Sequence, residues 1–390
     1  RILMSTSNRR EFLKNAAVSG TAVSAGLAAA GISSQRVFSE ETSNKYELRF
    51  RELGSTGFKV TEIGFGAMNM RDPELVQAAV DAGINYIDTA HKYMNGVNEQ
   101  VIGKVMMTKR DRVFLTTKVA DEDIPGMTTN LETSLKRLNT DHVDLLLAHS
   151  LNTADLLTHE EILRHLEDAK RKGKTRFIGY STHQLPDEYI DETLKADVYD
   201  AILVSYNYLS PPEVARNIKR AREAGIAIIA MKTQLKGKGN PDTSSDLQTP
   251  NQAALKWVLE NEYVDTAIPG VTTFEQLNED LKVMGMELSS RESHELRRYG
   301  ESLKGKYCCG VLGCNGCKDR CPYGVAIHEV NRCLGYAFGY GDLRLAKENY
   351  AEIPAGYGIN ACSDCDECQV RCINGLNLTE NMRRARSLFC

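Results

Sequence analysis

The chain has 390 residues, of which 42% are hydrophobic and 26% are charged, a balance typical of a globular protein with a buried core. Its formal net charge of −4 gives no electrostatic reason to expect a nucleic acid as partner. The length leaves room for two or three domains.

The first 30 residues have the pattern of an export signal. The stretch RREFLK (9–14) precedes a weakly apolar run that ends in three alanines (28–30). This run is too short and too weakly apolar for a stable membrane span. The segment resembles a twin-arginine signal peptide, with Asn8 where that pattern prefers Ser or Thr, which implies export of the folded protein to the periplasm. An amphipathic cytosolic helix is the alternative.

After a polar, aperiodic linker (31–47), short apolar runs alternate with amphipathic helical patterns as far as residue 302. The predicted strands are 62–68, 84–90, 112–119, 143–149, 175–181, 200–207, 226–233 and 264–270. Apolar strands between helices indicate a parallel sheet covered by helices, and eight such units predict an α/β fold, a (β/α)8 TIM barrel. An open doubly wound sheet is less favoured because no G-x-G-x-x-G follows the first strand.

Polar residues follow the ends of several of these strands, where a barrel carries its chemistry. They include Asp88, Lys118 and His149, and Tyr93 lies just beyond the second strand. An unperturbed tyrosine has a pKa near ~10, and a neighbouring lysine lowers it by favouring the phenolate. With an aspartate to hold the lysine and a histidine to orient a carbonyl, the set predicts a general acid for a carbonyl that receives hydride.

These residues lie in motifs that identify a family resemblance. The stretches RELGSTGFKVTEIGFGAM, IDTAHKY, TTKV, DLLLAH, GKTRFIGYST and AIPGVTTFEQLNED occur in chain order. They resemble the aldo-keto reductase family over about residues 48–300, whose Asp, Tyr, Lys and His correspond to Asp88, Tyr93, Lys118 and His149. The resemblance implies nicotinamide-dependent hydride transfer to or from a small carbonyl or alcohol substrate, with Tyr93 as the general acid or base.

The resemblance also implies where NAD(P)H binds. The expected contacts are Ser181, Asn207, Lys232, Thr272, Thr273, Gln276 and Asp280. Leu203 stands where the family often has a Gln for the nicotinamide amide. Gly270 and Gln276 stand where many members carry a Lys and an Arg for the 2′-phosphate, so the choice between NADH and NADPH stays open.

All eleven cysteines lie at or after Cys308, which indicates a separate module (303–390) with its own chemistry. Residues 362–372 have the spacing C-x2-C-x2-C-x3-C, and 314–322 has C-x2-C-x3-C-P. In two-cluster ferredoxins the last cysteine of each run ligates the other cluster, which predicts two 4Fe-4S clusters. One cluster is expected to take Cys309, Cys314, Cys317 and Cys372, and the other Cys321, Cys362, Cys365 and Cys368.

The module resembles the small, α-helical, ferredoxin-like extension that certain aldo-keto reductases carry. Cys308 is an alternative to Cys309 as a ligand, and zinc, disulfides or clusters with a purely structural role are alternative interpretations. Two functions follow. The first is an exported, nicotinamide-dependent oxidoreductase. The second is a catalytically inactive barrel that serves a redox partner protein as an iron–sulfur electron-transfer or binding subunit.

Overall fold

The computed structural model describes residues 46–120, 124–151, 153–234, 250–303, 305–308, 314, 316–317, 320–339, 341–351, 353–362 and 368–390. The predicted signal peptide and all but the end of the predicted linker lie outside these residues. Tyr46, the first described residue, is buried, and its phenol donates a hydrogen bond to Asn278 Oδ1 at 2.7 Å.

Eight parallel strands form a closed barrel, as the sequence predicts. Their order in the sheet follows their order in the chain, and the bridges Ile63–Ala267 and Gly66–Gly270 join the first strand to the last. The strands are β3 (Phe65–Gly66), β4 (Tyr86–Asp88), β5 (Phe114–Ala120), β6 (Val143–His149), β7 (Thr175–Thr182), β8 (Ala201–Ser205), β9 (Ala227–Met231) and β10 (Thr266–Ala267). All of β6 and β8 is buried, which explains their unbroken apolar runs.

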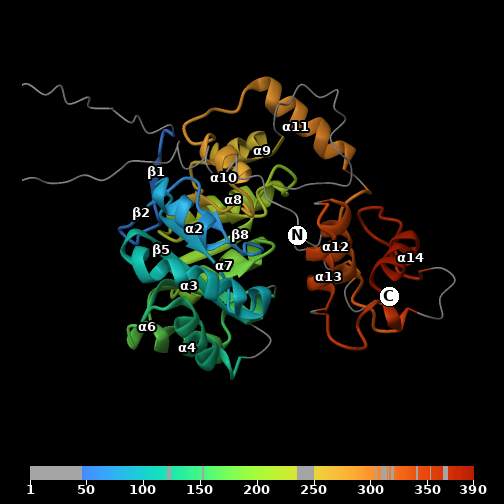
Figure 1. Cartoon of the computed structure of the whole chain (residues 1–390), viewed down its shortest axis with the longest axis horizontal. Coiled ribbons are helices and arrows are strands. Elements are labelled where there is room, and N and C mark those ends of the chain that lie inside the picture. The colour runs from blue at the N-terminus through green and yellow to red at the C-terminus, as the bar shows by residue number, and fades with distance from the viewer. Residues whose placement is uncertain are drawn as a thin grey trace, which may run out of the picture.

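Helices surround this sheet (Figure 1). They are α2 (Pro73–Asp81), α3 (Val97–Lys109), α4 (Met127–Leu138), α5 (Ala154–Leu157), α6 (Glu160–Arg171), α7 (Asp187–Ala196), α8 (Pro212–Glu223), α9 (Pro250–Leu259) and α10 (Phe274–Leu281), with 3₁₀ turns η1 (Tyr93–Gly96) and η2 (Arg110–Arg112). Helix α6 shows the pattern that drives their packing. It buries Ile162, Leu166 and Ala169 on one stripe and leaves charged residues outside.

A hairpin that the sequence did not predict covers the amino ends of the barrel strands. Its antiparallel strands are β1 (Phe50–Glu52) and β2 (Lys59–Thr61). The Phe58 ring meets the Phe114 ring edge-on at 5.3 Å, inside the barrel. Gly54 turns the hairpin at φ +52°, and a Cβ there would lie 2.5 Å from the Ala227 backbone nitrogen, so the close approach requires glycine.

The C-terminal module is helical where the structure describes it. It follows α11 (Ser290–Ser302) and contains α12 (Ile327–Phe338), α13 (Leu343–Ala351), η4 (Ile359–Ala361) and α14 (Leu378–Phe389). Its own core, centred on Val330, Ile359 and Met382, is separate from the barrel core. In Figure 1 the β1–β2 hairpin lies on the left of the barrel and α12 and α13 lie on the right, so the module faces the opposite end from the hairpin.

Candidate active site

The four predicted catalytic residues meet at the carboxyl end of the barrel. The Lys118 ammonium donates hydrogen bonds to Asp88 Oδ1 at 2.5 Å and to Tyr93 Oη at 3.3 Å. The His149 ring lies edge-on to the Tyr93 ring, with centroids 5.8 Å apart. Lys118 is only 1% exposed, so its charge acts through protein and not through water.

Strand register explains this convergence. Asp88 of β4 pairs with Thr116 of β5, and Lys118 lies two residues further on, on the same face of the strand. Tyr93 is turned toward them by a sharp bend in which the next three residues, Met94 to Gly96, have positive φ. A Cβ on Gly96 would lie 2.2 Å from Arg137 Cζ, so glycine allows this bend to pack.

Burial and charge set the protonation states of this group. The Asp88 carboxylate holds the pKa of Lys118 above its ordinary value against the effect of burial, so the lysine stays charged. Burial raises the pKa of Tyr93 more than the Lys118 ammonium lowers it, and the net direction is upward. Lys118 lowers the pKa of Tyr93, as the sequence predicts, but burial, which the sequence does not reveal, has the larger effect. The phenol is protonated at neutral pH, as a proton donor must be.

His149 is a neutral imidazole. Burial lowers its pKa well below the ordinary value, and the neighbouring Lys118, Lys92, His183 and Lys232 lower it further. Its Nδ1 atom is buried and has no hydrogen-bond partner among the described residues. A neutral histidine beside Tyr93 can orient a substrate oxygen without competing for its proton.

The predicted cofactor residues of the middle strands surround the same mouth. Ser181 Oγ accepts a hydrogen bond from the Ser150 backbone N–H at 2.8 Å. Both ends of the Asn207 amide bond to the backbone of nearby loops. Nδ2 donates to the Lys232 carbonyl at 3.1 Å, and Oδ1 accepts from the Leu209 N–H at 3.0 Å. Lys232 has a left-handed backbone, φ +57°, which turns the chain as β9 ends.

The remaining predicted cofactor residues lie at or within α10. Thr273 is its N-cap and forms a capping box with Gln276, whose Oε1 also accepts from the Thr272 N–H at 2.8 Å. Asp280 lies further along the helix and accepts a hydrogen bond from Gln234 Nε2 at 2.7 Å. The first turn carries Glu275 and no basic residue, so only the helix dipole and backbone N–H groups there attract an anion.

The predicted cluster ligands fall into two neighbourhoods in the C-terminal module. Cys321, Cys362 and Cys368 line one cavity of about 590 Å³. Burial raises the pKa of the Cys317 thiol, and the thiols of Cys314, Cys372 and, to a smaller extent, Cys368 raise it further. Cys309 and Cys365 lie outside the described residues.

A single metal ion would need several of the module's described side chains to converge on one point. No group of three or more His, Cys, Asp or Glu side chains within the described ranges could hold one. In a 4Fe-4S cluster each iron takes a different thiolate, so the four ligands surround a cavity and do not converge on one point. The described part of the chain also has no helix long and apolar enough to cross a membrane.

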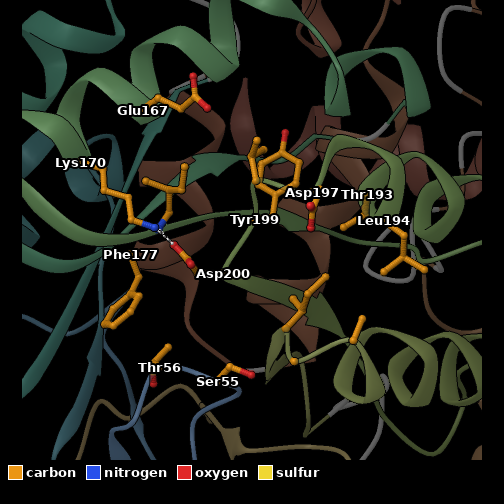
Figure 2. Close-up of a pocket in the computed structure, with 15 residues that line it drawn as sticks. Ser55, Thr56, Glu167, Lys170, Phe177, Thr193, Leu194, Asp197, Tyr199 and Asp200 are labelled. Carbon is orange, nitrogen blue, oxygen red and sulfur yellow. Dashed lines mark hydrogen bonds and ion pairs between the residues drawn. The ribbon is translucent and has the colours of Figure 1, made fainter.

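A second cavity, of about 430 Å³, opens at the hairpin end of the barrel (Figure 2). Ser55 and Thr56 of the hairpin turn line it, together with Phe177 and a Lys170–Asp200 ion pair of 2.8 Å. None of the predicted site residues lines this cavity. The catalytic group and this cavity therefore lie at opposite ends of the strands.

Three polar side chains of α12 were not predicted from the sequence as site residues. They are Glu329, Arg332 and Tyr336, and Arg332 and Glu329 affect the pKa of His183 after β7. The amphipathic pattern of residues 327–338 could have indicated the helix, but not which barrel side chain its charges affect. His183, just after β7, is likewise unpredicted. Burial lowers its pKa to about 3, helped by Lys232 and Arg332.

Residues 62–239 match the family model described as the Aldo/keto reductase family. The methylglyoxal reductase DkgB of Salmonella typhimurium is 28% identical over 252 residues, which cover 61% of this chain and 92% of that protein. The crystal structure of the thermostable aldo-keto reductase Tm1743, in complex with the inhibitor epalrestat, is 28% identical with a TM-score of 0.55 and covers 64% of this chain and 99% of its own.

An aldo-keto reductase from Klebsiella pneumoniae in complex with NADPH has the same fold, at 22% identity and a TM-score of 0.54, and covers 64% of this chain and 94% of its own. These matches support an aldo-keto reductase type of barrel.

Proposed function

We propose that this chain is an aldo-keto reductase that uses a nicotinamide cofactor to reduce a small carbonyl compound or to oxidise the corresponding alcohol. The observation that carries the proposal is the buried Lys118 ammonium, which bonds both the Asp88 carboxylate and the Tyr93 phenol. The family-model match and the DkgB relative, whose name is methylglyoxal reductase, agree with this chemistry.

In the direction of reduction, Tyr93 donates its phenolic proton to the carbonyl oxygen as the carbon–oxygen double bond becomes a single bond. A nicotinamide bound at this mouth would supply the hydride for the carbonyl carbon. Neutral His149 orients the carbonyl oxygen, and Lys118 stabilises the phenolate that Tyr93 becomes. Asp88 keeps Lys118 charged and in place.

The mouth contains groups suited to such a cofactor. Thr233, next to Lys232, has a buried hydroxyl without a hydrogen-bond partner in the described chain. The buried His149 Nδ1 atom likewise has no partner there. Lys232 and the N-terminus of α10 offer positive charge to a diphosphate. Because the first turn of α10 has Glu275 and no basic residue, we expect at most a weak preference for NADPH over NADH.

We further propose that the C-terminal module holds two 4Fe-4S clusters and that the protein is exported after they are inserted. One cluster would take Cys321, Cys362 and Cys368, which share a cavity, with Cys365 as its fourth ligand. The other would take Cys314, Cys317 and Cys372, which lie near one another, with Cys309 as its fourth ligand. The paired arginines near the N-terminus are the reason for the export proposal, because the twin-arginine route carries proteins that are already folded.

A second candidate function is an inactive barrel that serves a redox partner as an electron-transfer or binding subunit. Leu203 favours it, since this side chain packs in the apolar core beside the hairpin and offers no amide to a nicotinamide. The intact group around Lys118 favours the enzyme.

Anaerobically purified protein, titrated with NADH and NADPH and assayed on a panel of aldehydes and ketones, separates these functions. The enzyme requires nucleotide binding and turnover that Tyr93→Phe abolishes, while the matched variant Tyr357→Phe, at an exposed tyrosine of the module, retains it. A chain that binds neither nucleotide and turns over no substrate leaves only the partner-subunit function. Iron and sulfide measured on the same sample test the clusters.

A further inference from the structure

The turn that carries Tyr93 packs against an arginine of α4. Arg137, in the last turn of that helix, donates a hydrogen bond from Nη1 to the His91 carbonyl at 3.0 Å. The same guanidinium lies against Gly96, where a Cβ would come within 2.2 Å of Cζ. Arg137 therefore contacts the turn on both sides of Tyr93 in the chain.

A buried carboxylate holds this guanidinium in place. Glu99, in the first turn of α3, is fully buried, and its Oε2 atom accepts from Arg137 Nη1 at 3.3 Å. Its Oε1 atom accepts from the Thr117 hydroxyl at 2.7 Å. Thr117 immediately precedes Lys118 on β5. Glu99 thus joins the strand that carries the catalytic lysine to the arginine that contacts the turn.

Further hydrogen bonds connect the turn to the catalytic lysine itself. The His91 N–H donates to the Lys118 carbonyl at 2.9 Å, and Lys118 Nζ donates to the Thr89 carbonyl at 2.7 Å. The Thr89 hydroxyl donates to Oδ1 of Asn98, the neighbour of Glu99 on α3, at 2.6 Å. Thr89, Asn98 and Lys118 are buried, so these bonds act in a medium of low dielectric constant.

The conformation of the turn requires support from its surroundings. Met94 and Asn95 both have φ +53°, in the left-handed region that residues with a side chain rarely adopt. Such a backbone persists where the structure around it leaves no alternative. The bond from Arg137 to the His91 carbonyl precedes this stretch, and the contact with Gly96 follows it. The arginine therefore holds the strained segment at both of its ends.

We infer that the Arg137–Glu99 pair is the positioning group of the catalytic turn. Through the His91 carbonyl it sets the separation between the Tyr93 hydroxyl and the Lys118 ammonium, which is 3.3 Å. The inference rests on the proposed reductase function, and it assigns the pair to proton transfer and not to substrate binding. Proton transfer requires that the acid be aligned with its acceptor, so loss of the pair should lower kcat and leave KM nearly unchanged.

The first test compares Arg137→Met with the matched variant Arg110→Met. Arg110 pairs with the buried Asp144 carboxylate at 2.9 Å, and the side chains of the two pairs are similarly exposed, 16% and 3% against 23% and 0%. Arg110 lies before β5, at the end of the barrel opposite the mouth. Both variants should therefore lose stability for the same reason, a buried carboxylate without its cation.

Only Arg137→Met should lose catalysis. We expect its kcat to fall about tenfold to a hundredfold with KM nearly unchanged, whereas Arg110→Met should keep both constants. Where Arg137→Met does not fold, Arg137→Met/Glu99→Gln replaces it, because the amide removes the isolated charge and keeps an acceptor oxygen for Thr117. An unchanged kcat in the folded variant, or an equal loss of kcat in Arg110→Met, overturns the inference.

The second test needs no turnover, so it distinguishes failure of this inference from failure of the proposed function. Hydrogen exchange of the full-length protein, followed by mass spectrometry, reports the opening of the turn through the peptide 89–97, which contains the bonded His91 and Tyr93 N–H groups. This peptide should exchange several-fold faster in Arg137→Met than in Arg110→Met. Equal exchange in the two folded variants overturns the inference. Faster exchange in a protein that turns over no carbonyl substrate supports the positioning contacts and contradicts only the reductase function.

Discussion

Replacing Lys118 by methionine is the sharpest perturbation of the catalytic group. The change keeps most of the side-chain volume but removes the ammonium that bonds Asp88 Oδ1 at 2.5 Å, the Thr89 carbonyl at 2.7 Å and Tyr93 Oη at 3.3 Å. Asp88, 3% exposed, is then a buried carboxylate without its cation. Breaking one partner of such a buried pair typically costs about 3–5 kcal/mol.

The structure also predicts that the isolated charge on Asp88 causes much of this loss of stability. Burial already raises the pKa of Asp88, with Lys118 opposing it, so removal of the lysine should raise this pKa further. Asp88→Asn/Lys118→Met leaves no isolated charge and should therefore be more stable than Lys118→Met alone. Turnover should fall by about 10²–10⁴, the usual contribution of positioned acid–base catalysis.

Urea unfolding at pH 7 and steady-state reduction of a carbonyl substrate measure these effects. The matched control is Lys170→Met, because Lys170 also pairs with an aspartate, at 2.8 Å, but its side chain is 43% exposed. An exposed pair contributes about 0–1 kcal/mol. A Lys118→Met protein no less stable than Lys170→Met, or a double variant that is the least stable of the series, would contradict a buried, unpaired Asp88 carboxylate as the cause.

Three further outcomes are expected. Because the pKa of Tyr93 is raised, its phenol keeps the proton to higher pH, so the rate of carbonyl reduction should not fall through loss of this proton until above about pH 10. Spectrophotometric titration of the folded protein that shows a phenolate forming below about pH 8, and that Tyr93→Phe removes, contradicts this. Gln276→Arg adds a cation to the first turn of α10 and should improve NADPH over NADH about tenfold, whereas Gln252→Arg on α9 should not. Cys321→Ala should lower the iron and sulfide content of the anaerobic protein, whereas Cys390→Ala, at an exposed cysteine outside both motifs, should leave it unchanged.

Much of the barrel and its catalytic group could be predicted from the sequence by itself. Strands buried on both faces are apolar throughout, and polar residues then appear where each strand ends, as with Asp88 after Tyr86-Ile87 and His149 after Leu147-Ala148. Local periodicity encodes both features, so each of the eight predicted segments overlaps an observed strand. The clustering of cysteines after residue 308 likewise needs no structure to be seen.

Only the tertiary structure decided the direction in which the Tyr93 pKa shifts and which side chains surround the barrel mouth. Burial outweighs the lysine at Tyr93, and the extent of burial depends on what packs above the strand ends. Arg137 lies 46 residues after His91, whose carbonyl it bonds, and no periodic pattern carries information over that separation. The short strands β1 and β2 were missed for a related reason: they are held by the barrel that they cover and not by a pattern of their own.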